Sequence, residues 1–236
     1  MKIEDLLHRA SKEGASDAFI AADAALSIKV DGQIFPVSDH LLTAEDAREL
    51  VLSTMSEEQQ KEFEEHHECN YALTYDGMGR FRASAFVQRG KCGLVLRRIE
   101  TKIPRIDDIG LPPIIKELAM TKRGLVIFVG ATGTGKSTSL AAVVGHRNHN
   151  SRGHIISIED PIEFIHEHAG CIVTQREVGM DTDSYEVALQ NSLRQAPDVI
   201  LIGEVRSAKG MAQALAFAET GHLCLCTLHA NNANQA

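Results

Sequence analysis

The strongest chemical signal in this sequence is the stretch GATGTGKS at residues 130–137. It fits the pattern G-x-x-x-x-G-K-[ST] at every fixed position, after the apolar run LVIFVG and before an expected helix. Glycines let backbone N–H groups approach a phosphate, the lysine can reach the β- and γ-phosphates, and the hydroxyl beside it can bind Mg²⁺. The alternative is a glycine-rich turn without a ligand. The stretch predicts a nucleotide site formed by Gly130, Thr132, Gly133, Thr134, Gly135, Lys136 and Ser137.

Carboxylates should lie beside this site, because all strands of a parallel sheet end at the same edge and ligands bind there. The segment VILIGE places Glu204 at the carboxyl end of a strand. Asp198 begins that strand and should lie roughly 20 Å away, at about 3.3 Å per residue. We therefore predict that Glu204 and Ser137 hold Mg²⁺, the glutamate acting through water.

A second acidic group, in IISIEDPIEF, ends another strand at the same edge and offers Glu159, Asp160 and Glu163. Because Pro161 turns the chain, Glu163 can reach over the γ-phosphate and orient the attacking water. The alternative is a solvated acidic loop. In HLCLCTLH, His229 ends a strand and can sense the γ-phosphate, whereas His222 begins it, so that a structural or interface role fits it equally well.

Two other histidine groups have the composition of metal sites, but no paired spacing supports one. They are His66, His67 and Cys69, and His166, His168 and Cys171. We expect solvated surface at both. The five cysteines form no CxxC pair, which indicates reduced thiols, and Cys224 and Cys226 read as small apolar residues of a buried strand.

The elements that must position these residues fall into two groups. Residues 1–100 show a short helix from Ile3, a hairpin at Asp31-Gly32, helix-start boxes at Thr43 and Ser56, and three strands in 69–100. The segment 101–113 has three prolines and a glycine and predicts a linker. From 114 to 236, apolar strands alternate with helices, including 136–146, 185–196 and 208–220. This alternation predicts an α/β domain with a mainly parallel sheet, after a small α+β domain.

Composition narrows the function classes. The 236 residues are 44% hydrophobic and carry a net charge of −8, which fits two globular domains and argues against a nucleic-acid binder. No apolar run approaches the roughly 18 residues of a membrane-spanning helix. The start, MKIEDLLHRASKEG, has no apolar signal core. We expect a cytoplasmic protein.

The motifs GATGTGKS, IEDPIEF, DVILIGEVR and TGHLCLCTLHA, in this order and at these intervals, resemble the secretion (traffic) ATPase superfamily. Within it the chain is similar to the type IV pilus retraction motors, the PilT/PilU group. The segments ECNYALTYDGMGRFRASAF and TQREVGMDTDSYEVALQNSLRQAPDVILIGEVR look most like the PilU branch. The resemblance covers essentially the whole chain.

The resemblance implies a homo-hexamer whose subunits have a PAS-like domain (1–100), a hinge (101–113) and a RecA-like ATPase domain (114–236). Family members continue through a helical C-terminal portion, so the last domain is expected to be incomplete. ATP and Mg²⁺ bind between the domains. Motif matches assign Thr138 to the phosphate loop, Glu163 as catalytic glutamate, Glu204 as Walker B acid, and His222 and His229 to a histidine box.

The family also brings arginines from its N-terminal domain to the triphosphate, and the matching positions are Arg80 or Arg82, and Arg97. On a strand, Arg80 and Arg82 share one face and Phe81 the other. The alternative is an ordinary wet strand face with no ligand.

The function implied by the resemblance is an ATP-hydrolysing motor that powers pilus retraction and twitching motility. It would act as a hexamer or as an accessory to a PilT-type motor, and bind an inner-membrane pilus platform protein from the cytoplasmic side. Alternatives are an ATP-binding accessory subunit with little turnover, an assembly or secretion ATPase, a small-molecule kinase and a DNA translocase. A small-molecule kinase would need a lid-like arginine-rich insert, which this sequence lacks. A DNA translocase would need a basic channel, which the net charge argues against.

Overall fold

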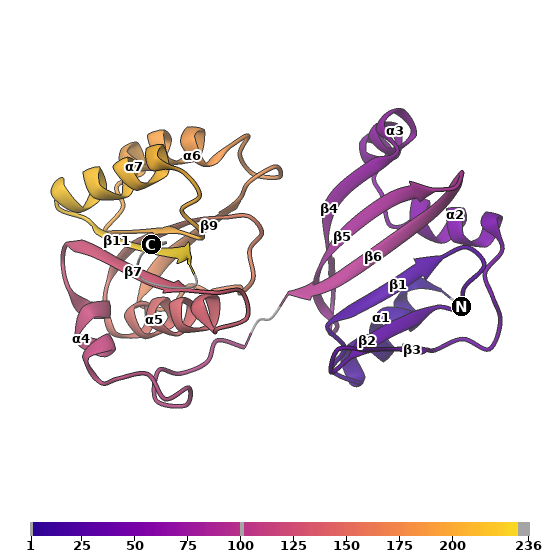
Figure 1. The fold of residues 1–236 in the computed structure, drawn as a ribbon, viewed down its shortest axis with the longest axis horizontal. Coiled ribbons are helices and arrows are strands. Elements are labelled where there is room, and N and C mark those ends of the chain that lie inside the picture. The colour runs from indigo at the N-terminus through magenta and orange to yellow at the C-terminus, as the bar shows by residue number, and fades with distance from the viewer. Residues whose placement is uncertain (1, 100–101, 231–236) are drawn as a thin grey trace. The chain divides into compact units, whose positions relative to one another are not determined.

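Figure 1 shows the computed structural model, which describes residues 2–99 and 102–230. The chain divides into two compact units, Met1–Ile99 and Glu100–Ala236, and each is described by itself. Most of the predicted linker belongs to the second unit, while Thr101 lies outside the described residues. Whether this segment works as a hinge stays a prediction.

The first unit is an antiparallel sheet with helices. Its strand order is β3 (Gln33–Pro36), β2 (Ser27–Val30), β1 (Asp17–Ala21), β6 (Lys91–Ile99), β5 (Gly79–Gln88), β4 (Glu68–Tyr75). Its helices are α1 (Ile3–Lys12), α2 (Ala44–Ser53) and α3 (Glu57–His66). The predicted helix starts are confirmed, because Thr43 and Ser56 each form a capping box with the residue three positions on. Strand β1 is not evident from the sequence, because it is short and largely buried on both faces.

The second unit is the predicted α/β fold. Its parallel strands have the order β7 (Gly124–Gly130), β11 (Leu223–His229), β10 (Val199–Ile202), β8 (Gly153–Glu159), β9 (Cys171–Glu177). Helices α4 (Ile114–Met120) and α5 (Lys136–Asn150) cover one face of the sheet, and α6 (Tyr185–Ser192) and α7 (Ala208–Glu219) cover the other (Figure 1). Separate buried clusters fill the two faces. The strands read as continuous apolar runs because both faces are covered.

Several boundaries differ from the sequence prediction. Helix α5 continues to Asn150, four residues past the predicted end. Helix α6 stops at Ser192 and tightens into a 3₁₀ turn at Leu193–Gln195, because Ala196 takes a left-handed conformation with φ of 50°. Strand β10 ends at Ile202, which leaves Glu204 on the loop after the strand.

Each cysteine of the chain is buried and reduced in the structure. Cys224 and Cys226 lie on the interior strand β11, where burial raises the pKa of these thiols to about 12 and about 11. The prediction that they are buried apolar residues is confirmed. Among the described residues, no helix combines the length and apolar character needed to span a bilayer.

Candidate nucleotide site

The phosphate-binding stretch forms the turn between β7 and α5. Gly133 and Gly135 have φ of 79° and 85°, which side chains rarely adopt, and a Cβ at either position would meet no atom within 4 Å. The turn therefore presents backbone to open space rather than to packed protein. Helix α5 begins at Lys136, so its unpaired N–H groups lie beside the turn. This cradle fits a phosphate group.

Lys136 lies folded over this turn. Its Nζ donates to the carbonyl oxygens of Gly130 and Ala131, each at 2.8 Å. Both acceptors are neutral, so a phosphate oxygen would make a stronger, charge-assisted bond with the same ammonium group.

A pocket at the carboxyl edge of the sheet brings five of the predicted residues of the second unit together, and His229 does not line it. Its lining includes Thr132, Lys136, Ser137, Glu163 and Glu204. These residues come from the phosphate-binding turn, from the start of α5 and from the loops after β8 and β10. Gly130, Gly133, Thr134, Gly135 and Thr138 belong to the turn and the first helical positions beside them. The Ser137 hydroxyl and the Glu204 carboxylate are oxygen ligands of the kind that Mg²⁺ prefers, so the pocket fits this ion.

The three carboxylates of the acidic loop have different surroundings. Glu159 accepts a hydrogen bond from the Ser157 hydroxyl at 2.7 Å, and burial raises the pKa of its carboxyl group. Asp160 forms an ion pair with Arg206 at 3.0 Å. Glu163 is exposed within the pocket lining. Glu163 is therefore the acid best placed to act on a bound ligand.

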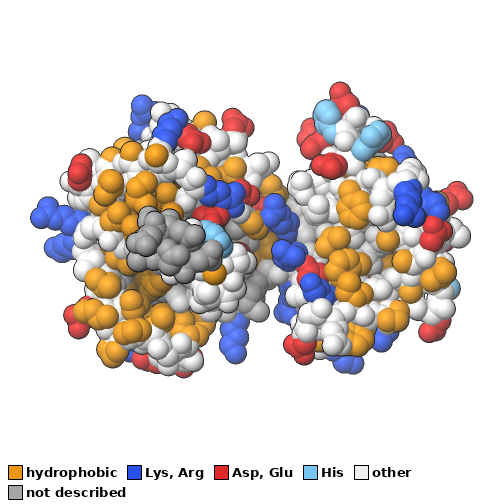
Figure 2. All heavy atoms as spheres, viewed as in Figure 1, with side chains coloured by type: hydrophobic (Ala, Val, Ile, Leu, Met, Phe, Trp, Pro, Cys, Tyr) orange, Lys and Arg blue, Asp and Glu red, His pale blue; other side chains and the backbone are white. Residues whose placement is uncertain are grey.

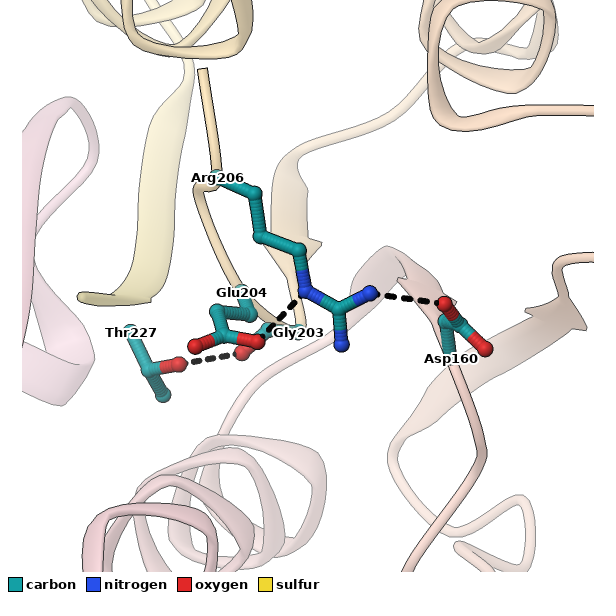
Figure 3. Close-up of polar contacts among 5 residues, drawn as sticks. All are labelled: Asp160, Gly203, Glu204, Arg206 and Thr227. Carbon is teal, nitrogen blue, oxygen red and sulfur yellow. Dashed lines mark hydrogen bonds and ion pairs between the residues drawn. The ribbon is translucent and has the colours of Figure 1, made fainter. Parts of the chain in front are cut away.

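Arg206 links the loop after β8 to the loop after β10, as Figure 3 shows. Its Nε donates to Glu204 at 2.7 Å while its Nη1 donates to Asp160. The Thr227 hydroxyl of β11 donates to the carbonyl of Gly203, which fixes the start of the same loop. Arg206 was not predicted as a site residue. The signal that could have found it is its position two residues after Glu204, on the same side of an extended segment.

The two predicted histidines lie at opposite ends of β11, His222 just before the strand and His229 as its last residue. His229 pairs in register with Gly130, the first residue of the phosphate-binding stretch, and is exposed. His222 precedes the strand, packs edge-on against Phe217 and lies within hydrogen-bond distance of its carbonyl oxygen. Asp198 is at the same far edge, where it accepts from the His154 N–H. The structure thus places His229, and not His222 or Asp198, at the edge of the candidate site.

The two histidine groups agree only in part with the prediction that both are solvated surface. His66 and His67 are exposed at the end of α3, where Figure 2 shows histidines among acidic side chains. The expectation of solvated surface is wrong for His166, which is 9% exposed and lines the candidate pocket. It is also wrong for Cys171 of the same group, which is buried. The loop folds back onto β9, which a local sequence pattern cannot show. In the part of the chain that the structure describes, no histidine, cysteine and carboxylate side chains gather as a metal site.

We predict that His166 makes stability depend on pH. Burial, with a smaller contribution from His149, lowers its pKa from 6.5 to about 4. Between these values the unfolded chain binds a proton that the folded chain does not, so stability falls as the pH falls. Lowering the pH from 7 to 5 should therefore reduce the free energy of unfolding by about 2 kcal/mol through this histidine. His166→Gln should lose correspondingly less unfolding free energy over this range, measured by urea titration at both pH values. The exposed-site control His66→Gln should behave like the wild type, and equal pH dependence in all three proteins would contradict the prediction.

The predicted arginines lie on one face of the first unit's sheet. Arg82 pairs in register with Arg97 across β5 and β6, and Phe81 is buried on the opposite face. Arg97 forms an ion pair at 2.8 Å with Asp17, which is only 5% exposed. Asp17 therefore offsets the repulsion of two like charges on adjacent strands. The Arg80 side chain is half-buried on the same face as Arg82.

Comparisons with known proteins show the family and the fold. The family model for "Type II/IV secretion system protein" matches residues 1–236. The chain is 65% identical to the type IV pilus ATPase PilU of Pseudomonas aeruginosa over 236 residues, which is all of this chain and 62% of PilU. It is 40% identical to the pilus retraction ATPase PilT of the same organism, covering 99% of this chain and 68% of PilT. A crystal structure of the retraction motor PilT with bound ADP matches with a TM-score of 0.93 at 42% identity, over 99% of this chain and 68% of that one. The chain thus spans less than two thirds of the PilU relative.

Proposed function

This chain belongs to the type II/IV secretion system protein family, and from that premise we propose that it is the ATP-binding and ATP-hydrolysing portion of a motor subunit for type IV pilus retraction. The observation that carries the proposal is the single pocket that combines the phosphate-binding turn with Lys136, Ser137, Glu163 and Glu204. The names of the similar PilU and PilT proteins support the pilus as the structure moved.

The binding step uses groups that are already in place. The N–H groups of the turn and of the first turn of α5 point to where phosphates would lie. Lys136 exchanges its two carbonyl acceptors for phosphate oxygens, a change from neutral to charge-assisted hydrogen bonds. Ser137 and Glu204 would hold Mg²⁺, which when bound would neutralise charge on the phosphoryl oxygens.

The hydrolytic step depends on Glu163. Its carboxylate accepts a proton from, and orients, the water that attacks the γ-phosphate. Arg206 binds one oxygen of the Glu204 carboxylate, so the other oxygen would be available to the metal. Asp160 holds the same guanidinium through its Nη1. His229 lies beside Gly130 at the end of β11, where its side chain senses whether the γ-phosphate is present.

The mechanical step couples the two units. Arg82, Arg97 or Arg80 completes the charge around the triphosphate, and the segment 101–113 serves as the hinge between the units. Loss of the γ-phosphate removes a charge that holds this arrangement, so hydrolysis changes the relation of one unit to the other. Subunits assemble as a homo-hexamer, alone or beside a PilT-type motor, and act on a pilus platform protein at the cytoplasmic face of the inner membrane.

The test measures phosphate release from ATP and Mg²⁺ by the full-length protein, alone and mixed with a PilT-type paralogue, without any added acceptor. Release that disappears in Glu204→Ala supports the proposal. A kinase would release no phosphate in this assay and would form ADP only after an acceptor is added. Near-zero turnover that Glu204→Ala leaves unchanged would favour an accessory subunit that only binds ATP. Size measurement with ATP and Mg²⁺ tests assembly, and a monomer under every condition would exclude the shared-site mechanism.

A further inference from the structure

The loop that carries Glu163 is tied down on both sides of that residue. It runs from Asp160 to Gly170, between the parallel strands β8 and β9. Ile162 and His166 are buried, whereas Glu163 is exposed in the pocket lining. The neighbours Ile162 and His166 are therefore packed, while Glu163 between them faces open space.

Two side chains of β9 make these attachments. The Glu177 carboxylate accepts the Ile162 N–H at 3.1 Å, immediately before Glu163. The Gln175 amide accepts the His166 N–H through Oε1 at 2.8 Å and donates through Nε2 to the Phe164 carbonyl at 2.8 Å. The same Nε2 lies 3.3 Å from the Glu159 carboxylate.

The side chains of Gln175 and Glu177 are chemically suited to holding this loop. Gln175 and Glu177 are two positions apart, so their side chains leave β9 on the same face. Gln175 binds one backbone donor and one backbone acceptor of the loop, and only an amide side chain of this length supplies both functions without charge. The Glu159 carboxylate, held also by Ser157, orients the amide so that Nε2 faces the loop carbonyl.

We infer that Gln175 is a positioning residue that holds Glu163 toward the phosphate-binding turn. The inference rests on the proposed ATPase function and adds to it a residue that does not touch the ligand. In the bonded arrangement the backbone at Phe164 and His166 is held to β9, which limits the directions that the Glu163 side chain can take. Without the amide the segment from Phe164 to His166 would lose both of its bonds to Gln175, and Glu163 could turn away although Ile162 and the end of the loop stay attached.

The main experiment compares Gln175→Met with wild type in the full-length protein. Methionine keeps the length of the side chain and removes both hydrogen-bonding functions. We expect kcat to fall by about 10²-fold, the loss typical of a slightly misplaced catalytic group. The affinity for a fluorescent ADP analogue and the KM for ATP should stay within about threefold, because the phosphate-binding turn is untouched. Ile172→Val, at an exposed position of the same strand, is the matched control and should leave all three quantities unchanged.

A double variant separates positioning from stability. If Gln175 acts through Glu163, Gln175→Met should lower kcat no further in a Glu163→Gln background, whereas independent effects would multiply. Gln175→Glu gives a second signature, because its protonated form regains one donor for the Phe164 carbonyl. Its activity relative to wild type should therefore rise as the pH falls from 8 to 6.

The outcomes are distinct. Unchanged kcat in Gln175→Met, while Glu163→Gln is inactive, overturns this inference and leaves the proposed function standing. A lower melting temperature with unchanged kcat shows a structural role only and overturns it too. Absence of hydrolysis in wild type, with and without a paralogue, removes the proposed function and this inference together.

Discussion

A Glu163→Gln variant will bind ATP as tightly as the wild type and hydrolyse it about 10²- to 10⁴-fold more slowly, the contribution typical of a general base. Glutamine keeps the size of the side chain but cannot take a proton from water. Glu163 is exposed, and its side chain takes no part in the bonds by which Glu177 and Gln175 hold the loop, which run through Ile162, Phe164 and His166. The fold should therefore survive the change.

Single-turnover hydrolysis and binding of a fluorescent ATP analogue measure the two quantities separately. Glu167→Gln is the matched control, because this acid lies on the same loop and is also exposed. It should retain wild-type turnover. If Glu163→Gln hydrolyses ATP within threefold of the wild type, the role assigned to this carboxylate is wrong.

The largest loss is expected at the arginines of the first unit. Arg82→Ala or Arg97→Ala should lower kcat by about 10³-fold or more, the contribution of an arginine that stabilises charge in phosphoryl transfer. Binding of ADP should change much less, because it lacks the γ-phosphate where that charge develops. The measurement is steady-state phosphate release, with ADP affinity determined in parallel.

Position 97 needs a second variant. Arg97→Ala leaves the buried Asp17 carboxylate without its ion-pair partner, and that alone can destabilise the first unit. Arg97→Lys keeps a positive charge for Asp17 and removes the planar guanidinium. Arg98→Ala is the control, since Arg98 lies on the same strand with its side chain on the other face. Wild-type kcat in both Arg82→Ala and Arg97→Lys would exclude these arginines from the reaction.

The sequence was sufficient where one physical rule acts locally. Capping boxes at Thr43 and Ser56 and the alternation around Phe81 depend on residues within a few positions, and the structure confirms them. The edge rule for parallel sheets depends only on strand direction. It brought Lys136, Glu163 and Glu204 to one edge, and the structure places them around one pocket. Their catalytic roles stay predictions.

The sequence was insufficient where a side chain meets a distant strand. His166 looked like surface, because nothing near it in the sequence shows that its loop folds against β9. Gln175 gave no signal, since a polar residue in a strand is usually solvated. Arg206 depends on Asp160, which precedes it by 46 positions. Such contacts are set by the packing of the finished sheet.

The burial of every cysteine has a practical consequence for labelling this protein with dyes. A thiol must be accessible and ionised to react with a maleimide, and these thiols are inaccessible, with Cys69, Cys171, Cys224 and Cys226 also having raised pKa values. Cysteines introduced at exposed positions, such as Ser84 in one unit and Arg152 in the other, would therefore take up a donor and an acceptor dye with little background. Energy transfer between the dyes would then report how far apart the units stand at each stage of the nucleotide cycle.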